Sequence, residues 1–355
     1  MPAVQRSVSV VIPTRNRVPV LIETLRAAFA AAGTQGPAFE VLVVDDGDGG
    51  SLDVGSAFRE RPLRIVRNRG RGAAAARNCG AASARHELLV FIDDDIILTP
   101  GTIERHIETH ERYPQALVSG VVRPDERVIQ EARRTAFGRY KLRFDYPLDN
   151  SGRVESLGDG VFGVDRVASF NLSVARADFF GRIGGFDERF PYAGCEDQEF
   201  SFRAHARGLR TLVNEGLICF HNEADRLSPE AWLRRQYTGV QGAVLLAHLY
   251  PEGKEHPIYR TFSSVSRRDS VPLQLRKVVV ATFSVGSTPV ILLKTLLVLE
   301  RCRFPDPVLF KGFHLLWAIH THRGFREGLR RLPELESPVS GPEVRGGSGS
   351  EGPAL

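Results

Sequence analysis

The sequence has few cysteines, and none is placed as a disulfide framework would require. Cys79, Cys195, Cys219 and Cys302 are widely spaced over 355 residues, and no C-x-x-C pair occurs. This spacing favours free thiols in a reducing compartment. Residues 1–6 also lack the apolar core of a secretory signal peptide, and the first apolar run has the length of a strand. We therefore expect a cytoplasmic location.

Other absences exclude further classes of protein. No stripe of basic and aromatic residues indicates a nucleic-acid groove, so no nucleic-acid partner is expected. The first apolar run ends in Pro-Thr-Arg-Asn rather than in G-x-G-x-x-G, which argues against an NAD-dependent oxidoreductase. The net charge is nevertheless +5. It fits either an ordinary basic surface or attraction to anionic partners such as diphosphates and lipid head groups.

A clean membrane-spanning run is also missing. Residues 278–299 have the length of a span, which is about 20 residues, but Gly286, Pro289 and Lys294 interrupt them. We predict two packed or interfacial helices there, with peripheral contact to a membrane included. Residues 308–329 form a basic amphipathic pattern, which suits either a helix docked on the main domain or one lying on a membrane surface. A peripheral position at the inner face of the membrane is therefore one expectation.

Alternating strand and helix patterns dominate the first half of the chain. Strands are expected at residues 8–12, 39–44, 64–66 and 88–92, and helices at 18–32, 72–84 and 102–113. This order is typical of α/β proteins with a mostly parallel sheet flanked by helices. We expect one α/β domain over residues 1–225 and a helical extension over 226–335. Residues 336–355 are rich in Gly, Ser, Pro and Glu, which predicts a disordered tail.

Polar residues follow three of the predicted strands, as Pro13-Thr14-Arg15-Asn16, Asp45-Asp46 and Asp93-Asp94-Asp95. Ligands of parallel sheets bind beyond the carboxyl ends of the strands, so these clusters should converge on one crevice. Three adjacent carboxylates repel one another unless a cation neutralises them, and oxygen ligands suit Mg²⁺ or Mn²⁺. A solvated acidic turn is the alternative for the triplet, and a simple turn aspartate is the alternative for Asp46.

A basic, glycine-containing run at residues 67–72 leads into the alanine-rich helix. The N-terminus of a helix favours anions, and glycines before it allow close approach of a ligand to the backbone. Arg77 lies about a turn and a half inside this helix, where it can reach a base or a phosphate. A glycine-rich loop by itself is a weak signal.

Several motifs, in this order, resemble those of family 2 glycosyltransferases over roughly residues 7–222. They are the opening strand with Pro13 to Arg17, V-V-D-D-G at 43–47, G-x-x-x-A-x-N-x-G at 72–80, F-I-D-D-D at 91–95 followed by Pro100-Gly101, G-G-F-D-E at 184–188, and Glu196-Asp197 with Phe200 and Arg203. The resemblance implies a GT-A fold, an inverting mechanism, and dependence on Mg²⁺ or Mn²⁺.

The resemblance also assigns roles to residues. It implies that the nucleotide sugar contacts Pro13, Thr14, Arg15, Asn16, Asp46, Arg77, Asp93, Asp94 and Asn171, the last in a loop lining the sugar and acceptor site. It implies metal ligands at Asp93, Asp95 and His221, with Asp95 the main one. A purely structural histidine is the alternative for His221.

Asp197 is the implied general base, and Glu196 is the second candidate. An inverting transfer needs one group to take the proton of the acceptor hydroxyl, and a carboxylate within hydrogen-bond reach suits that role. The alternative for Asp197 is a role in capping its helix.

Two other functions remain open from the residues alone: a nucleotidyltransferase, and a non-catalytic nucleotide-sugar-binding protein of the same fold. A UDP-sugar is the default donor, with thymidine and guanosine nucleotides as alternatives. The acceptor is open between a lipid-linked molecule, a saccharide and a small metabolite.

Overall fold

The first four strands of the central sheet follow the predicted arrangement. The computed structural model describes residues 7–32, 38–49, 52–55, 58–145, 153–190 and 192–336. In these residues β1 (Val8–Thr14), β2 (Phe39–Asp45), β3 (Leu63–Arg67) and β4 (Leu88–Ile92) pair in parallel in the order β3-β2-β1-β4. All five residues of β4 are buried, as expected for a strand covered on both faces.

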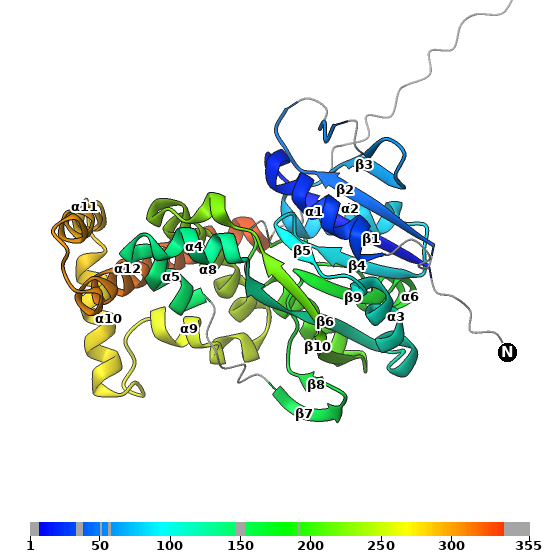
Figure 1. Cartoon of the computed structure of the whole chain (residues 1–355). Helices are drawn as coiled ribbons and strands as arrows, with labels where there is room; N and C mark the ends of the chain where they lie inside the picture. The colour runs from blue at the N-terminus through cyan, green and yellow to red at the C-terminus, as the bar shows by residue number, and fades with distance from the viewer. Residues whose placement is uncertain are drawn as a thin grey trace, which may run out of the picture.

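Helices cover both faces of these strands (Figure 1). One core cluster joins the strands to α1 (Val18–Ala31) and α3 (Thr102–Arg112), and another joins them to α2 (Gly72–Ser83) and α7 (Glu196–Ala206). Helix α2 approaches β1 closely at Gly80, where an added Cβ would lie 2.3 Å from Val11 Cγ1. Glycine at this position therefore lets the helix N-terminus sit at the strand ends.

The second half of the sheet contains strands that run the other way. β9 (Asn171–Ala175) inserts between β4 and β6 (Ala116–Pro124) and is antiparallel to both. β10 (Arg210–His221) is parallel to β6 but antiparallel to β8 (Val161–Val164) and β5 (Ile96–Leu98), and β7 (Arg153–Gly158) pairs with β8. The sequence did not predict β5, β7, β8 or β9; β5 and β8 have only three and four residues. The β5–β10 pairing places His221 opposite Ile96, next to the aspartate triplet.

The helical part of the molecule draws on two stretches of sequence. It contains α8 (Pro229–Leu249), α9 (Pro257–Phe262), α10 (Val271–Phe283), α11 (Thr288–Arg301) and α12 (Asp306–Glu336). The mid-chain helices α4 (Glu126–Arg133) and α5 (Ala136–Asp145) lie beside it (Figure 1). Phe137 and Tyr140 of α5 pack against Trp232 of α8 and Phe313 of α12. The proposed boundary near residue 225 remains a prediction, and the predicted tail, apart from Glu336 at the end of α12, lies outside the described residues.

The apolar stretch after α9 forms two helices, as predicted. Over the described ranges, no single helix combines the length and apolar composition needed to cross a bilayer. Helices α10 and α11 meet that test only as a pair, and they are bent by 95° relative to each other. The bend lies at residues 284–287, where Gly286 has a φ of +58°.

Candidate active site

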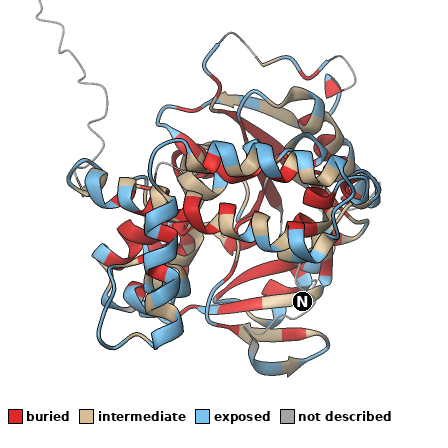
Figure 2. Cartoon of the chain, turned by 90° about the vertical axis from the view of Figure 1, so that its left-hand side faces the viewer, coloured by how far each residue is buried: buried red, intermediate tan, exposed pale blue. Residues whose placement is uncertain are grey.

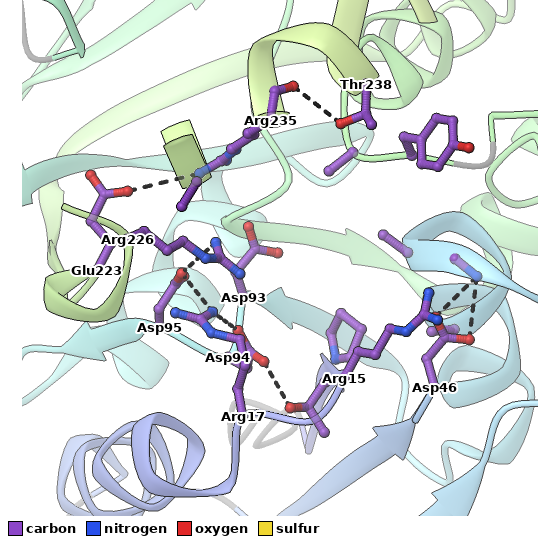
Figure 3. A pocket seen from close by; sticks show the side chains of 18 of the residues that line it. Arg15, Arg17, Asp46, Asp93, Asp94, Asp95, Glu223, Arg226, Arg235 and Thr238 are labelled. Atoms are coloured by element: carbon purple, nitrogen blue, oxygen red, sulfur yellow. Dashed lines mark hydrogen bonds and ion pairs between the residues drawn. The ribbon is translucent and has the colours of Figure 1, made fainter. Parts of the chain in front are cut away.

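A cavity of about 460 Å³ lies at the carboxyl ends of β1, β2 and β4, as the sequence predicted. Pro13, Thr14, Arg15, Asp46 and all three residues of the aspartate triplet line it (Figure 3). The helical part supplies the opposite wall, which contains Trp232, Arg234, Arg235 and Thr238 of α8. Asn16 does not line this cavity; it lies in the exposed turn after β1 with a φ of +57°.

Asp46 is held at the N-terminus of α2. Its carboxylate accepts a hydrogen bond from Asn68 Nδ2 at 2.7 Å and from the backbone N–H of Gly72 at 3.1 Å. Its remaining lone pairs are available to a ligand in the cavity. Arg15 pairs with the exposed Asp48 at 3.0 Å, at the rim of the same region.

The three adjacent aspartates have three different environments. Asp93 accepts from Arg77 at 2.8 Å. Asp94 accepts from Thr14 Oγ1 at 2.7 Å and pairs with Arg17. Asp95, only 1% exposed, pairs with Arg17 at 2.9 Å and with Arg226 at 3.1 Å. The three aspartates lie in a turn, which is closed by a hydrogen bond from the N–H of Ile96 to the carbonyl of Asp93.

These environments separate the pKa values of Asp94 and Asp95. Burial raises the pKa of Asp94 to about 6, against the opposing charge of Arg17. Burial acts in the same direction on Asp95, but its hydrogen bond to His221 and the charges of Arg17 and Arg226 hold its pKa well below the ordinary range. The lowered pKa keeps Asp95 ionised near neutral pH, as a metal ligand must be.

Asp95 and His221 are suitably placed to share a divalent ion. Asp95 Oδ1 lies 3.2 Å from His221 Nε2, close to the separation of about 3 Å between adjacent ligands that each lie about 2.1 Å from a metal. Over the described ranges, however, no three His, Cys, Asp or Glu residues are grouped so that they could hold a metal ion. Mg²⁺ and Mn²⁺ sites often use one or two carboxylates and take further oxygens from phosphates and water. The residues present fit such a site, and Asp93, which faces Arg77, is not part of the Asp95–His221 pair.

A second cavity of about 380 Å³ adjoins the first. The two share four lining residues, Arg77, Asp93, Ala193 and Arg235. The second cavity also contains Glu196 and Asp197 at the start of α7, together with Gln236 of α8, His256 and Thr321 of α12. Asp94 and Asp95 therefore lie in the cavity that adjoins that of the predicted base, and Asp93 lines both.

The two base candidates differ in the hydrogen bonds that their carboxylates already accept. Glu196 is 4% exposed, and its oxygens are used by Arg77 at 3.1 Å and by the backbone N–H of Gly194 at 2.6 Å. Asp197 is half-buried and accepts from the N–H of Gln198 at 2.8 Å. Burial, and then the negative charge of Glu196, raise the pKa of Asp197 to about 7. A carboxylate with a pKa near neutrality suits proton transfer, so the geometry favours Asp197 over Glu196.

Arg77 connects the two spaces. Its guanidinium is 2% exposed and bonds to both Asp93 and Glu196, and it lies 5.4 Å from the centre of the Phe186 ring. Arg77 lines both cavities, which is consistent with its predicted place in the site. Contact with a nucleotide remains a prediction, since both of its charged partners are already protein carboxylates.

The expected position of Asn171 is wrong. It does not lie in a loop at the site but begins β9, fully buried, and its side-chain oxygen lies 2.9 Å from His106 Nε2. The neighbours Ser169 and Phe170 line the second cavity instead. The sequence does not predict the antiparallel strand β9. It therefore predicts a loop at Asn171, where the structure has a buried strand residue.

The sequence also missed several charged residues of the site. Arg17 pairs with Asp94, Asp95 and Asp225, and Arg226 pairs with Asp95. Lys141 of α5 pairs with Glu223, which lies 3.8 Å from Arg235. Only Arg17 carried a usable signal, because it closes the motif after β1. The others lie outside recognisable motifs and reach the site through tertiary packing.

Known proteins share both the sequence pattern and the fold. Residues 9–164 match the family described as glycosyl transferase family 2. Validoxylamine A glucosyltransferase of Streptomyces hygroscopicus subsp. jinggangensis is 31% identical over 233 residues, 58% of this chain and 53% of that protein. Chondroitin synthase of Pasteurella multocida is 25% identical over 246 residues, 61% of this chain and 24% of that protein. The chain thus spans about half the length, or less, of these curated relatives.

A solved structure supports the fold over nearly the whole chain. Mannosyltransferase PcManGT of Pyrobaculum calidifontis, in complex with GDP-Man and Mn²⁺, superimposes with a TM-score of 0.55 at 18% identity, covering 92% of this chain and 89% of that one. This likeness extends through the helical part as well as the sheet. From the ordered motifs, the sheet and these relatives, we conclude that residues 9–164 match glycosyltransferase family 2 and that the chain has the GT-A fold.

Proposed function

We propose that this protein is an inverting, metal-dependent glycosyltransferase that moves a sugar from a nucleoside-diphosphate sugar to an acceptor hydroxyl. One observation carries the proposal: two cavities meet at Arg77 and Asp93, with the aspartate triplet in one and Asp197 in the other. The sugar would lie at this junction. The donor would approach from the triplet side and the acceptor from the Asp197 side.

The first cavity suits a nucleoside diphosphate. Asp46 offers a hydrogen-bond acceptor to a base or ribose, and the N-terminus of α2 favours negative charge. Asp95 and His221 would hold Mg²⁺ or Mn²⁺, which neutralises charge on a leaving diphosphate. The similar structure of PcManGT contains GDP-Man and Mn²⁺, which supports this class of donor and metal. Uridine remains the default base.

The second cavity suits the acceptor and the base. As the acceptor oxygen bonds to the anomeric carbon, the bond from that carbon to the diphosphate oxygen breaks, and Asp197 takes the hydroxyl proton. Attack opposite the leaving group inverts the anomeric configuration. Gln198 Oε1 and Thr321 Oγ1, from residues that line this cavity, are buried without a hydrogen-bond partner among the described residues. Such atoms favour a polyhydroxylated acceptor, such as a saccharide or the sugar end of a lipid-linked molecule.

A donor panel with Mn²⁺ or Mg²⁺ tests the proposal. We expect release of nucleoside diphosphate from at least one donor, and loss of that release with a chelator. Asp197→Asn should lower the rate by at least about a thousandfold, because it removes the base, while donor affinity stays within about twofold. Asp159→Asn is the matched control, since Asp159 is an exposed aspartate that pairs with Arg112.

Other outcomes distinguish the remaining functions. Release of pyrophosphate from nucleoside triphosphates would identify a nucleotidyltransferase. Tight donor binding without turnover on any acceptor would identify a binding protein. Full activity of Asp197→Asn would remove Asp197 as the base.

A further inference from the structure

The end of the molecule farthest from the strands β1 to β4 exposes a concentration of apolar side chains. Of the sixteen most exposed large hydrophobic residues in the described chain, twelve lie between residues 265 and 308. They belong to α10, α11, the turn between them and the flanking segments, which we call the α10–α11 surface (Figures 1 and 2). They are Val265, Val271, Leu275, Val278, Val279, Phe283, Val285, Val290, Ile291, Val298, Phe304 and Val308.

Helix α10 exposes a row of apolar side chains and buries a charged one. Val271 is 76% exposed, and Leu275 and Val278 follow it on the same face at 64% and 52%. The two buried residues of the helix are Lys277, which pairs with Asp269 at 2.8 Å, and Val280. A surface helix ordinarily turns its apolar stripe inward and its charges outward. Single exposed valines are common, but a concentration of exposed apolar residues of this kind marks an interaction surface.

Positive charge accompanies the apolar side chains. Residues 264–311 contain eight Lys and Arg against three Asp and Glu, an excess equal to the +5 of the entire chain. All three acids are engaged within the protein: Asp269 by Lys277, Glu300 by the N–H of Ala136, and Asp306 by Arg139. The exposed cations Arg267, Arg268, Lys294, Arg301, Arg303 and Lys311 have no carboxylate partner among the described residues.

These features favour one occupant. A second copy docked by the same face would place the unpaired cations against one another, which costs association energy. A membrane span is disfavoured by the 95° bend between α10 and α11 and by exposed cations on α11. Helices with apolar and basic residues side by side instead lie in the headgroup region, with valines and leucines inserted and Lys and Arg on anionic phosphates.

We propose that the α10–α11 surface docks this protein on the headgroup region of an anionic lipid bilayer. The inference does not depend on the proposed transferase function, because it rests on a surface that lines neither cavity. Docking would hold the protein at the membrane by its helical end.

Sedimentation of the full chain with lipid vesicles tests the proposal. We expect binding to vesicles that contain phosphatidylglycerol, weaker binding to pure phosphatidylcholine, and loss of binding at high salt. Val271→Ser/Leu275→Ser/Val278→Ser should weaken binding at least about tenfold, because it removes inserted apolar area. Val154→Ser is the matched control, since Val154 is 67% exposed on β7, outside the α10–α11 surface.

A second variant tests the charge. Each cation near an anionic surface changes the partitioning of a protein onto that surface by about fivefold. The triple variant Lys294→Gln/Arg301→Gln/Arg303→Gln should therefore weaken vesicle binding by about a hundredfold. Arg59→Gln/Arg85→Gln, at exposed sites in the sheet half, should leave it unchanged. Unaltered thermal unfolding would show that each variant folds. The proposal is overturned if vesicles do not bind, if both variants bind like the parent, or if the serine variant instead abolishes a dimer formed without lipid.

Discussion

Residues next to each other in sequence acquire different chemistry from what packs around them. Asp94 and Asp95 have the same side chain, yet burial raises the pKa of the first while His221 and two arginines lower that of the second. Glu196 and Asp197 differ in their hydrogen bonds, since Glu196 accepts from Arg77 and from the N–H of Gly194, whereas Asp197 accepts from the N–H of Gln198. Pairs of carboxyls with separated pKa values are typical of sites that divide tasks between them.

The pKa of Asp197 sets a pH dependence of the proposed reaction. A base must be deprotonated to act, so the rate should fall as the pH falls through about 7, rather than near pH 4 as for an ordinary aspartate. The measurement is kcat from pH 5 to 9 at saturating donor, acceptor and Mn²⁺. A profile that stays flat down to pH 5 would contradict the assignment. A parallel profile of donor affinity separates this limb from protonation of Asp94.

At the scale of elements, the site depends on how closely α2 lies on the sheet. The N–H of Gly72 at the start of α2 donates to Asp46, and near its other end the helix packs against β1 and β2 at Gly80, where a Cβ would meet Val11 and Val44. The same helix presents Arg77 between the two cavities. Moving α2 outward would therefore change both the first cavity and the bond between Arg77 and Glu196.

Gly80→Ala should destabilise the protein despite the better helix propensity of alanine. Overpacking in a core costs about 1–3 kcal/mol, against a gain of up to about 1 kcal/mol from replacing glycine in a helix. We expect a net loss of about 1–2 kcal/mol in the free energy of unfolding, measured by urea denaturation. Gly181→Ala is the control, since nothing lies within 4 Å of its added Cβ. Equal stability of the two variants would show that α2 can shift without strain.

At the scale of the whole molecule, the helical part completes both cavities. Helix α8 contributes Thr238 to the first, and α12 contributes Thr321 to the second, from positions 83 residues apart. The α5–α8–α12 aromatic cluster, in which Phe137 contacts Trp232 and Phe313, fixes these helices relative to one another. The second cavity is therefore built largely from sequence beyond the matched family region.

Thr321→Val should raise KM for the acceptor by about three- to tenfold with donor KM unchanged, because the variant keeps the shape but loses one hydrogen bond. Thr238→Val should instead raise the donor KM and leave the acceptor KM unchanged, since Thr238 lines the first cavity and not the second. Steady-state kinetics with each substrate varied in turn gives both values. An unchanged acceptor KM for Thr321→Val would place the acceptor elsewhere.

Local sequence determined the four parallel strands, their helices and the convergence of Asp46, Asp93, Asp94 and Asp95 at one edge, because strand periodicity and strand-end chemistry are encoded over a few residues. Tertiary structure decided what depends on contacts between distant segments: the antiparallel β9 that buries Asn171, the arginines Arg17 and Arg226 on Asp95, the approach of His221 through β5, and the second cavity beside Asp197. The contact between Asp95 and Arg226 joins residues 131 positions apart, a separation over which no periodicity or motif carries information.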